Sequence, residues 1–466
     1  AIDYALFIVS RFREELATPG ADPAAAVRRT LATAGRTVFF SGVTIALALA
    51  SLLIFPQSFL RSIALGGISA VLVAMLASLT VLPALLAMLG PRINLGRVRL
   101  PGRRRAAGLE GAARADGGWA RLARSVMRRP VRYLVGVTAA LLLLATPTLR
   151  MELGGFDVRV LPEQAQARVV AETIEDRFPG GLSDPIDVLV TGATPAAAEE
   201  YQARLEALPE VTGVVLAGQE GTSWLLRADY PGEASGKSAE AAVVAIRDLP
   251  VPDGVEVLVG GTTASHVDLL DSLRERLPWM LLLIVTTILV LLFLAFGSVV
   301  LPIKAVLMNV ISIGASFGVV VWVFQDGHFA ELLQFTPTGF IEPTMPILML
   351  AMLFGLSTDY EVFLLSRVRE EWDRTGDNTE AVARGLQHTG RIITAAALLL
   401  GVVVAGFTTG DMALIKLAGV GMIVALAVDA TLVRALLVPA TMRLLGRWNW
   451  WAPGPLARLY RRYPLH

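Results

Sequence analysis

Residues 355–371 read GLSTDYEVFLLSRVREE and place an aspartate, Asp359, inside an apolar run long enough to span a bilayer. Residues 1–15, AIDYALFIVSRFREE, repeat this pattern, with Asp3 in the register of Asp359. A carboxylate within hydrocarbon costs roughly 2.5–3.5 kcal/mol on insertion scales and indicates a functional site by default. Two carboxylates at matching positions of a repeat therefore predict a functional centre where these two helices meet.

The composition predicts an integral membrane protein. Hydrophobic residues make up 54% of the chain, and they occur in blocks of about 20, the length that crosses a bilayer as a helix. Cysteine is absent, which excludes disulfides and thiolate metal sites. The sequence contains no glycine-rich phosphate-binding loop, so nucleotide-driven transport has no support. The chain has no initiator methionine and begins within a helix pattern, and we therefore expect a fragment that has lost its N-terminal part.

The apolar blocks predict a series of membrane spans, of which the first, ending near residue 12, lacks its beginning. The others fall at about 36–55, 61–89, 131–149, 279–296, 300–324, 343–366, 390–408 and 413–445. An arginine-rich connection covers residues 92–132, and positive charge marks the cytoplasmic side of a membrane protein. We interpret this connection as an orientation signal with some attraction to anionic lipid, and not as a nucleic-acid binding site.

These assignments divide the chain into six parts. They are the last three helices of a first repeat (1–90), a basic cytoplasmic linker (91–130), one span (131–149), an extracytoplasmic domain (150–277), five spans of a second repeat (278–446) and a cytoplasmic tail (447–466).

The region 150–277 is acid-rich, and we predict that it is a soluble domain. After an amphipathic helix at about 163–178, its pattern is strand, helix, strand, strand, helix, strand. The strands are expected at 186–191, 211–217, 222–229 and 254–259, and the helices at 195–208 and 237–248. This βαββαβ order is typical of a ferredoxin-like unit. No metal cluster or nucleophile–base arrangement is visible, and the isolated His266 is interpreted as a surface or capping residue, so we expect no enzyme.

The repeat extends beyond the two Asp-Tyr helices. Each charged exit is followed by Ala-Val and then by Gly-Arg, which is Gly35-Arg36 in one copy and Gly390-Arg391 in the other. Two further spans then end in a proline, Pro83 or Pro439. Both copies have the same orientation, which indicates a parallel repeat with a pseudo-twofold axis along the membrane normal. By symmetry, the missing N-terminus should carry three spans and a second soluble domain.

The spacing within each signature helix predicts the chemistry. Asp359, Phe363 and Ser366 lie on one helix face, as do their counterparts in the first copy. If the two halves meet at the axis, the carboxylates face each other away from water and titrate jointly. The adjacent hydroxyls of Tyr4 and Tyr360 can donate to a carboxylate or accept from a carboxylic acid. The alternative is that each Asp-Tyr pair only joins helices by hydrogen bonds, and the duplicated pattern makes that interpretation the weaker one.

Other polar residues of the spans give less specific signals. Ser41 and Thr394 are candidates to extend the polar path, although hydroxyls also bond their own backbone. Phe7 and Phe363 are interpreted mainly as packing residues, with a cavity lining as the minor alternative. Asp429 and Arg434 are expected to form structural ion pairs with other helices. Glu361 has no counterpart in the first copy, and it should pair with a neighbouring helix or turn toward the interface.

Two segments, IDYALFIVSRFREEL (2–16) and FGLSTDYEVFLLSRVREEW (354–372), resemble the signature helices of the MMPL (mycobacterial membrane protein large) family. VFQDGHFAELLQF (323–335) and DATLVRALLVPA (429–440) add to the resemblance. This family is a branch of the resistance-nodulation-division (RND) superfamily. The resemblance implies an RND-type helical bundle with 150–277 as the second porter domain, and a proton relay that consists of Asp3, Tyr4, Asp359 and Tyr360. The family's N-terminal third is absent here.

The resulting hypothesis is a proton-driven exporter of lipids or hydrophobic compounds in the plasma (inner) membrane. Its partners would be membrane lipids, a lipid or hydrophobic substrate, protons and the missing N-terminal half, without a cofactor or nucleic acid. The alternative is a non-transporting lipid- or sterol-sensing receptor or an assembly scaffold of the same fold. The substrate's identity and the oligomeric state stay open.

Overall fold

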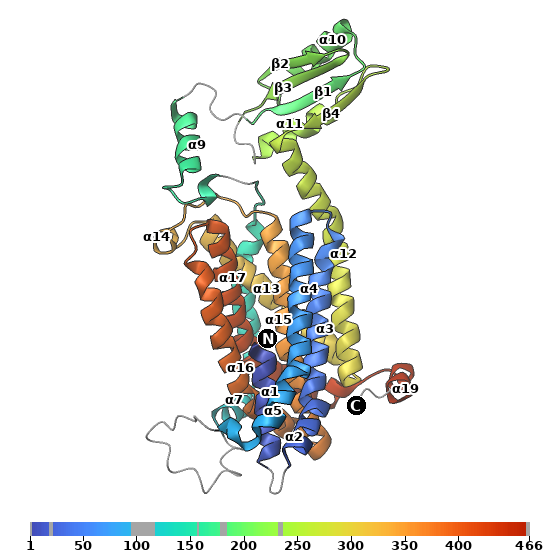
Figure 1. Cartoon of the computed structure of the whole chain (residues 1–466), viewed down its shortest axis with the longest axis vertical. Helices are drawn as coiled ribbons and strands as arrows, with labels where there is room; N and C mark the ends of the chain where they lie inside the picture. The colour runs from blue at the N-terminus through green and yellow to red at the C-terminus, as the bar shows by residue number, and fades with distance from the viewer. Residues whose placement is uncertain are drawn as a thin grey trace.

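The computed structural model describes residues 2–17, 22–94, 117–155, 158–177, 184–231 and 236–462. A helical bundle carries a small sheet domain at one end, and the long helix α12 (Thr262–Phe296) joins the two (Figure 1). We call the two ends of the bundle the sheet end and the far end. Eight of the described helical segments are long and apolar enough to cross a membrane. They are Pro23–Ile54, Ser58–Ile93, Pro130–Arg150, Thr262–Phe296, Val300–Gln325, Thr344–Thr375, Asn378–Thr408 and Ala413–Trp450.

The bundle is built from two runs of helices. The first comprises α1 (Ile2–Leu16), α2 (Pro23–Thr30), η1 (Leu31–Gly35), α3 (Arg36–Ala50), η2 (Ser51–Ile54), α4 (Ser58–Leu79), α5 (Val81–Leu89) and η3 (Gly90–Asn94). The second comprises α7 (Gly118–Arg128), α8 (Pro130–Ala145), η4 (Thr146–Arg150), α12, α13 (Val300–Val320), η6 (Val321–Gln325), α14 (Ala330–Leu333), α15 (Thr344–Thr375), α16 (Asn378–Thr408), α17 (Ala413–Val428), η7 (Asp429–Leu437), α18 (Val438–Leu445), η8 (Gly446–Trp450) and α19 (Gly454–Arg462).

Eight of the nine predicted spans each overlap one of these segments, which confirms a polytopic helical membrane protein. The first predicted span, which ends near residue 12, corresponds to α1, whose 15 residues are not among the eight. Several helices are longer than the spans that the sequence predicts. α15 and α16 continue as helices through the polar stretch after residue 366, where the i,i+4 pairs Arg369–Asp373 and Arg384–Glu380 support them. α12 begins well before the membrane and passes through Pro278, which removes only one hydrogen bond of the ladder.

α15 is the central helix of the bundle. Within its apolar window 78% of the residues are buried, against 22% for α16 and for the segment that contains α4. It packs against α3 on one side and α16 on the other, and it also contacts α13, α17 and α12. The signature stretch therefore lies where side chains from several helices can reach it.

The sheet domain has the predicted ferredoxin-like topology. Its elements are β1 (Ile186–Thr191), α10 (Pro195–Glu206), β2 (Gly213–Glu220), β3 (Ser223–Asp229), α11 (Lys237–Arg247) and β4 (Glu256–Gly260), preceded by η5 (Val158–Val160) and α9 (Gln166–Arg177). The strand order is β2-β3-β1-β4, and every neighbouring pair is antiparallel. Alternate residues of β1, including Val188 and Val190, are fully buried against the helices, which the period of two along a strand requires.

The far end of the bundle carries α2, α5, α7 and the C-terminal helix α19 (Figure 1). The arginine-rich linker lies mostly outside the described residues, since 95–116 are not among them. Its described part, α7, packs its apolar face against α16 and α18. One arginine of α7, Arg124, lies 3.6 Å from Glu380 of α16.

Candidate functional site

The two signature helices contact each other through their Asp-Tyr pairs. The Tyr360 hydroxyl of α15 donates to Asp3 Oδ2 of α1 at 2.9 Å. The Ser41 hydroxyl of α3 donates to Asp359 Oδ1 and lies 3.4 Å from the Tyr4 hydroxyl. Each tyrosine therefore interacts with the aspartate of the other repeat. Tyr360 bonds Asp3 directly, and Tyr4 reaches Asp359 through the Ser41 hydroxyl. Oxygen atoms from three helices thus form two hydrogen-bonded groups, one at each carboxyl.

The two carboxyl groups differ in their surroundings. Asp359 is 2% exposed, while Asp3 in the first turn of α1 is partly exposed. The expectation that both carboxylates lie away from water therefore holds for Asp359 only. Tyr4 and Tyr360 are buried beside them at 3% and 2% exposure. The centre has one dry carboxyl and one that is more accessible.

A single hydroxyl accounts for part of this difference. In the register set by Gly35-Arg36 and Gly390-Arg391, the counterpart of Ser41 is Ala396, which has no polar group. The other candidate for the polar path, Thr394, is not at the centre. Its side chain is exposed and its hydroxyl donates to the Gly390 carbonyl at 2.7 Å, because α16 turns Ile393 and Ala396 toward the centre instead.

Phe7 and Phe363 form an aromatic layer one helical turn toward the far end. Their ring centroids are 4.3 Å apart, with an angle of 55° between the ring planes. A cavity of about 20 Å³ lies on the centre side of this layer, between Asp3, Tyr360 and the two rings, and α16 closes it. That volume holds about one water molecule. The atoms that face this space are apolar, although it adjoins the Tyr360–Asp3 hydrogen bond.

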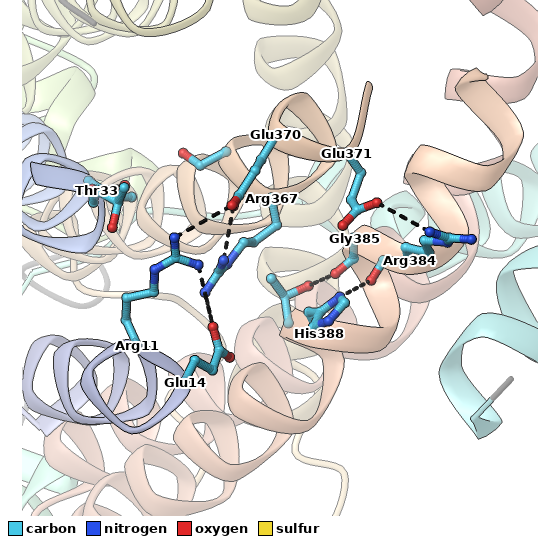
Figure 2. Close-up of polar contacts among 12 residues, drawn as sticks. Arg11, Glu14, Thr33, Arg367, Glu370, Glu371, Arg384, Gly385 and His388 are labelled. Atoms are coloured by element: carbon cyan, nitrogen blue, oxygen red, sulfur yellow. Dashed lines mark hydrogen bonds and ion pairs between the residues drawn. The ribbon is translucent and has the colours of Figure 1, made fainter. Parts of the chain in front are cut away.

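Four charged residues form a reciprocal cluster one further turn toward the far end, and we call them the charge square (Figure 2). Arg11 of α1 pairs with Glu370 of α15 at 3.5 Å, and Arg367 of α15 pairs with Glu14 of α1 at 3.0 Å. Each arginine also pairs with the glutamate of its own helix, Arg11 with Glu14 at 3.5 Å and Arg367 with Glu370 at 2.9 Å. The pseudo-twofold repeat therefore produces two crossed ion pairs that join α1 to α15.

An open cavity of about 390 Å³, which we call the far-end vestibule, extends from the aromatic layer past the charge square. Besides residues of the square, its lining includes Thr37, Phe40, Ala295 and Ser366. Phe7 lines this vestibule and also the small cavity beside Asp3. Its ring is therefore a partition between a space for one water and a space that opens at the far end.

The other flank of α15 carries a second buried polar group. Arg434 and Asp429 form an ion pair of 2.7 Å within the π-helical segment η7, where five-residue spacing brings side chains onto one face. The prediction that Asp429 and Arg434 form ion pairs with other helices is wrong, because the two residues pair with each other. The hydrogen bonds of this pair do reach α15, since the Ser357 hydroxyl lies 2.9 Å from Asp429 Oδ1 and Arg434 donates to the Ser357 carbonyl. The Arg434 guanidinium also lies 5.3 Å from the centre of the Tyr360 ring.

A larger cavity of about 950 Å³ opens at the sheet end, between the bundle and the sheet domain. Its lining mixes apolar and charged side chains, among them Leu149, Met151, Leu270, Phe340, Glu152 and Arg274. His266 lies on this lining and is partly buried. Burial lowers the pKa of its imidazole below the ordinary value. Among the described residues, no cluster of three or more histidines or carboxylates could hold a metal ion.

The chain matches the model of the MMPL family over residues 1–133 and 159–464. It is 38% identical over 501 residues to the trehalose monomycolate exporter MmpL3 of Mycobacterium tuberculosis. This alignment covers 100% of this chain and 53% of the relative. The heme uptake protein MmpL11 of the same organism is 37% identical over 472 residues, covering 98% and 48%. A putative membrane protein of Streptomyces coelicolor is 43% identical over 464 residues, covering 99% and 63%.

A solved structure also resembles this chain. The crystal structure of SecDF in its super-membrane-facing form superimposes with a TM-score of 0.54 at 14% identity, over 99% of this chain and 53% of that one. This likeness shows a shared fold alone. The chain spans 48–63% of the length of these curated relatives.

Proposed function

Since the chain belongs to the MMPL family of the RND superfamily, we propose that it works within a proton-driven secondary transporter that exports a lipid or another hydrophobic compound. The observation that carries this proposal is the crossed Asp-Tyr centre, in which Tyr360 donates to Asp3 and Ser41 donates to Asp359. Keeping two carboxyls within the membrane spans costs free energy. A scaffold without transport activity would gain nothing that offsets this cost.

The centre can pass a proton between two unlike sites. An isolated ionised carboxylate is costly at the depth of Asp359, and the hydroxyl of Ser41 donates a hydrogen bond to this one. Asp3 is more accessible and lies beside the space for one water. A proton that crosses the membrane potential releases about 2.3 kcal/mol per 100 mV. Changing the charge of the centre would alter the packing of α1 against α15 and so couple that energy to movement.

We assign the far end to the cytoplasm and the sheet domain to the outside of the plasma membrane. The support is the arginine-rich sequence around residues 92–132, which follows the positive-inside rule. Protons would then leave through the far-end vestibule, once the aromatic layer of Phe7 and Phe363 separates. The charge square would hold α1 and α15 together in the closed arrangement.

The cavity at the sheet end suits an amphipathic substrate. It combines apolar side chains of the bundle with charged groups that are already paired, such as Glu152 with Lys237 at 3.2 Å and Arg274 with Glu240 at 3.5 Å. A lipid with a polar headgroup would satisfy both kinds of lining. The names of MmpL3 and MmpL11 refer to different substrates, so family membership does not fix the compound.

The deciding experiment replaces Asp359 by asparagine in the protein produced from its own gene and reconstituted in liposomes. Asp359→Asn keeps the shape of the side chain and removes its proton exchange. Gradient-driven export of the lipid should fall to background while the variant keeps its melting temperature. The matched control is Asp411→Asn, in the exposed turn between α16 and α17, which should transport normally. Undiminished export by Asp359→Asn would refute the relay, and lipid binding without any gradient dependence would favour the receptor alternative.

A further inference from the structure

Two buried charged residues outside the Asp-Tyr centre have no ion-pair partner among the described residues. Lys304 of α13 is 7% exposed and Glu361 of α15 is 4% exposed. Neither Lys304 Nζ nor Glu361 Oε1 accepts or donates a hydrogen bond within the described part of the chain. A buried charge without a partner is among the most costly arrangements in a protein. The sequence offered one hint, because Glu361 has no counterpart in the first repeat.

Two more unpartnered polar atoms lie in the same region. Asn309 Nδ2 of α13 and Arg434 Nη1 of η7 are both buried and lack a hydrogen-bond partner among the described residues. The Ser357 hydroxyl connects this region, since it lies 2.7 Å from Asn309 Oδ1 and, as described, beside the Asp429–Arg434 pair. Ser357 and Glu361 are one turn apart on the same face of α15.

The charges of this region act on one another. Glu361 interacts electrostatically with Lys304 and Arg434, which are attractive, and with Asp429, which is repulsive. Lys304 interacts in turn with Glu361 and Arg434. Two cations and two carboxylates give a formal charge of zero. Buried polar groups that lack protein partners are normally bridged by ordered water with two to four partners each.

We propose that Lys304, Glu361, Asp429 and Arg434 form a charge-neutral, water-binding site behind the proton relay, and that this site sets the pH at which Asp359 exchanges its proton. Lys304 and Glu361 are positioning residues here, because they act on Asp359 through their charges and do not carry the transported proton. The inference rests on the proposed proton relay and goes beyond it by adding residues from α13 and η7.

Arg434 links this water site to the relay. Its guanidinium lies over the ring of Tyr360, whose hydroxyl donates to Asp3. The charged and titratable groups that interact with Asp359 are Asp3 and Tyr4 of α1, Tyr360 of α15 and Arg434 of η7. Those that face Glu361 are Lys304 of α13 and the two residues of η7.

The expected size of the effect follows from Coulomb's law. Asp359 and Glu361 are two positions apart on a helix with side chains pointing to nearly opposite sides, so their carboxyls are on the order of 10 Å apart. At an effective dielectric constant of about 20, one charge at that distance changes a proton equilibrium by about one pH unit. An effect of this size is readily measured in a transport assay.

The test compares three variants of the protein from its own gene in proteoliposomes, with export measured against the pH of the proton-supplying side. Glu361→Gln removes a negative charge, which favours the ionised form of Asp359, so the pH of half-maximal export should fall by about one unit. Lys304→Met removes a positive charge, so the half-maximal pH should rise by a similar amount. The double variant is neutral again and should return to the wild-type value within a few tenths of a unit.

Opposite shifts that cancel are expected from electrostatics, whereas a purely structural role would lower the amount of folded protein without this pattern. The control is Ser316→Ala on α13, equally buried, whose hydroxyl bonds only its own helix at Ser312; it should not shift the profile. Shifts of the same sign, or none, would overturn the water site while leaving the relay intact if Asp359→Asn is still inactive. If the single variants do not accumulate, a double variant that accumulates well supports the site and one that fails equally overturns it.

Discussion

Removing the ring of Phe7 should turn the transporter into a proton leak. Phe7 is the partition between the cavity of about 20 Å³ beside Asp3 and the far-end vestibule of about 390 Å³. Phe7→Ala would free roughly 100 Å³, enough for about three waters at about 30 Å³ each. Water would then connect the relay to the far end without any movement of α1. We expect protons to cross in the absence of substrate, at several times the wild-type rate.

The assay is dye-reported acidification of proteoliposomes under a potassium diffusion potential, with no lipid substrate added. A Phe→Ala change in a packed core costs about 3–5 kcal/mol of stability, so the variant's melting temperature is measured in parallel. Phe7→Leu keeps more of the volume and should leak less. Combining Phe7→Ala with Asp359→Asn should abolish the leak, because the water path ends at Asp3 and the relay beyond Asp3 would then lack its second proton-exchanging group.

Phe40→Ala is the matched control for this prediction. Phe40 lines the far-end vestibule but not the cavity beside Asp3, so its removal enlarges the vestibule without opening the partition. An equal leak from Phe40→Ala and Phe7→Ala would refute the reasoning, since it would mean that the aromatic layer does not separate the two spaces. No leak from a folded Phe7→Ala would refute it as well.

Two further predictions concern single contacts, each with a control on the same kind of residue. Ser41→Ala removes the hydrogen bond to Asp359. Because hydrogen bonds to charged groups contribute about 1.5–3 kcal/mol, export should fall by roughly 10- to 100-fold. The control is Ser51→Ala, which should export normally, because Ser51 is equally buried but bonds only to the Ala48 carbonyl at 2.5 Å. Gly318→Ala places a methyl group against the backbone carbonyl of Leu144, which cannot move aside. It should destabilise the packing of α8 on α13 by about 1–3 kcal/mol, measured as a lower melting temperature in detergent. The control is Gly314→Ala, whose added methyl meets only the Ala145 methyl at 3.6 Å and which should be nearly neutral.

The sequence predicts well those features that depend on long periodic patterns. The spans follow from apolar blocks of bilayer length, and the sheet topology follows from the order of short alternating strands. The meeting of α1 with α15 follows from the duplication itself, because a parallel repeat brings equivalent helices to a common axis. The contact of Ser41 with this centre was anticipated only as one of several possible hydroxyls.

Features that depend on the phase of one helix against another were not predictable. Thr394 has the same chemistry as Ser41, but the rotation of α16 turns it away from the centre. The pairing of Asp429 with Arg434 requires a π-helical segment, and regular helix periodicity gives no signal for it. The sequence does not predict the charge square, because it identifies these arginines and glutamates only as the charged exits of the two signature helices.

The repeat duplicates the acids, but the rest of the chain makes them unequal. With Pro83 and Pro439 aligned, the counterparts of Asp429 and Arg434 in the first half are Val73 and Ser78, neither of which is charged. Asp359 and Arg434 therefore come from the second repeat, and the Ser41 hydroxyl of the first repeat donates to Asp359 without a counterpart at Asp3. Two identical carboxyls would share a proton equally and give it no preferred place. Unequal surroundings assign the proton a favoured site in each arrangement of the helices, which a transporter with a defined direction requires.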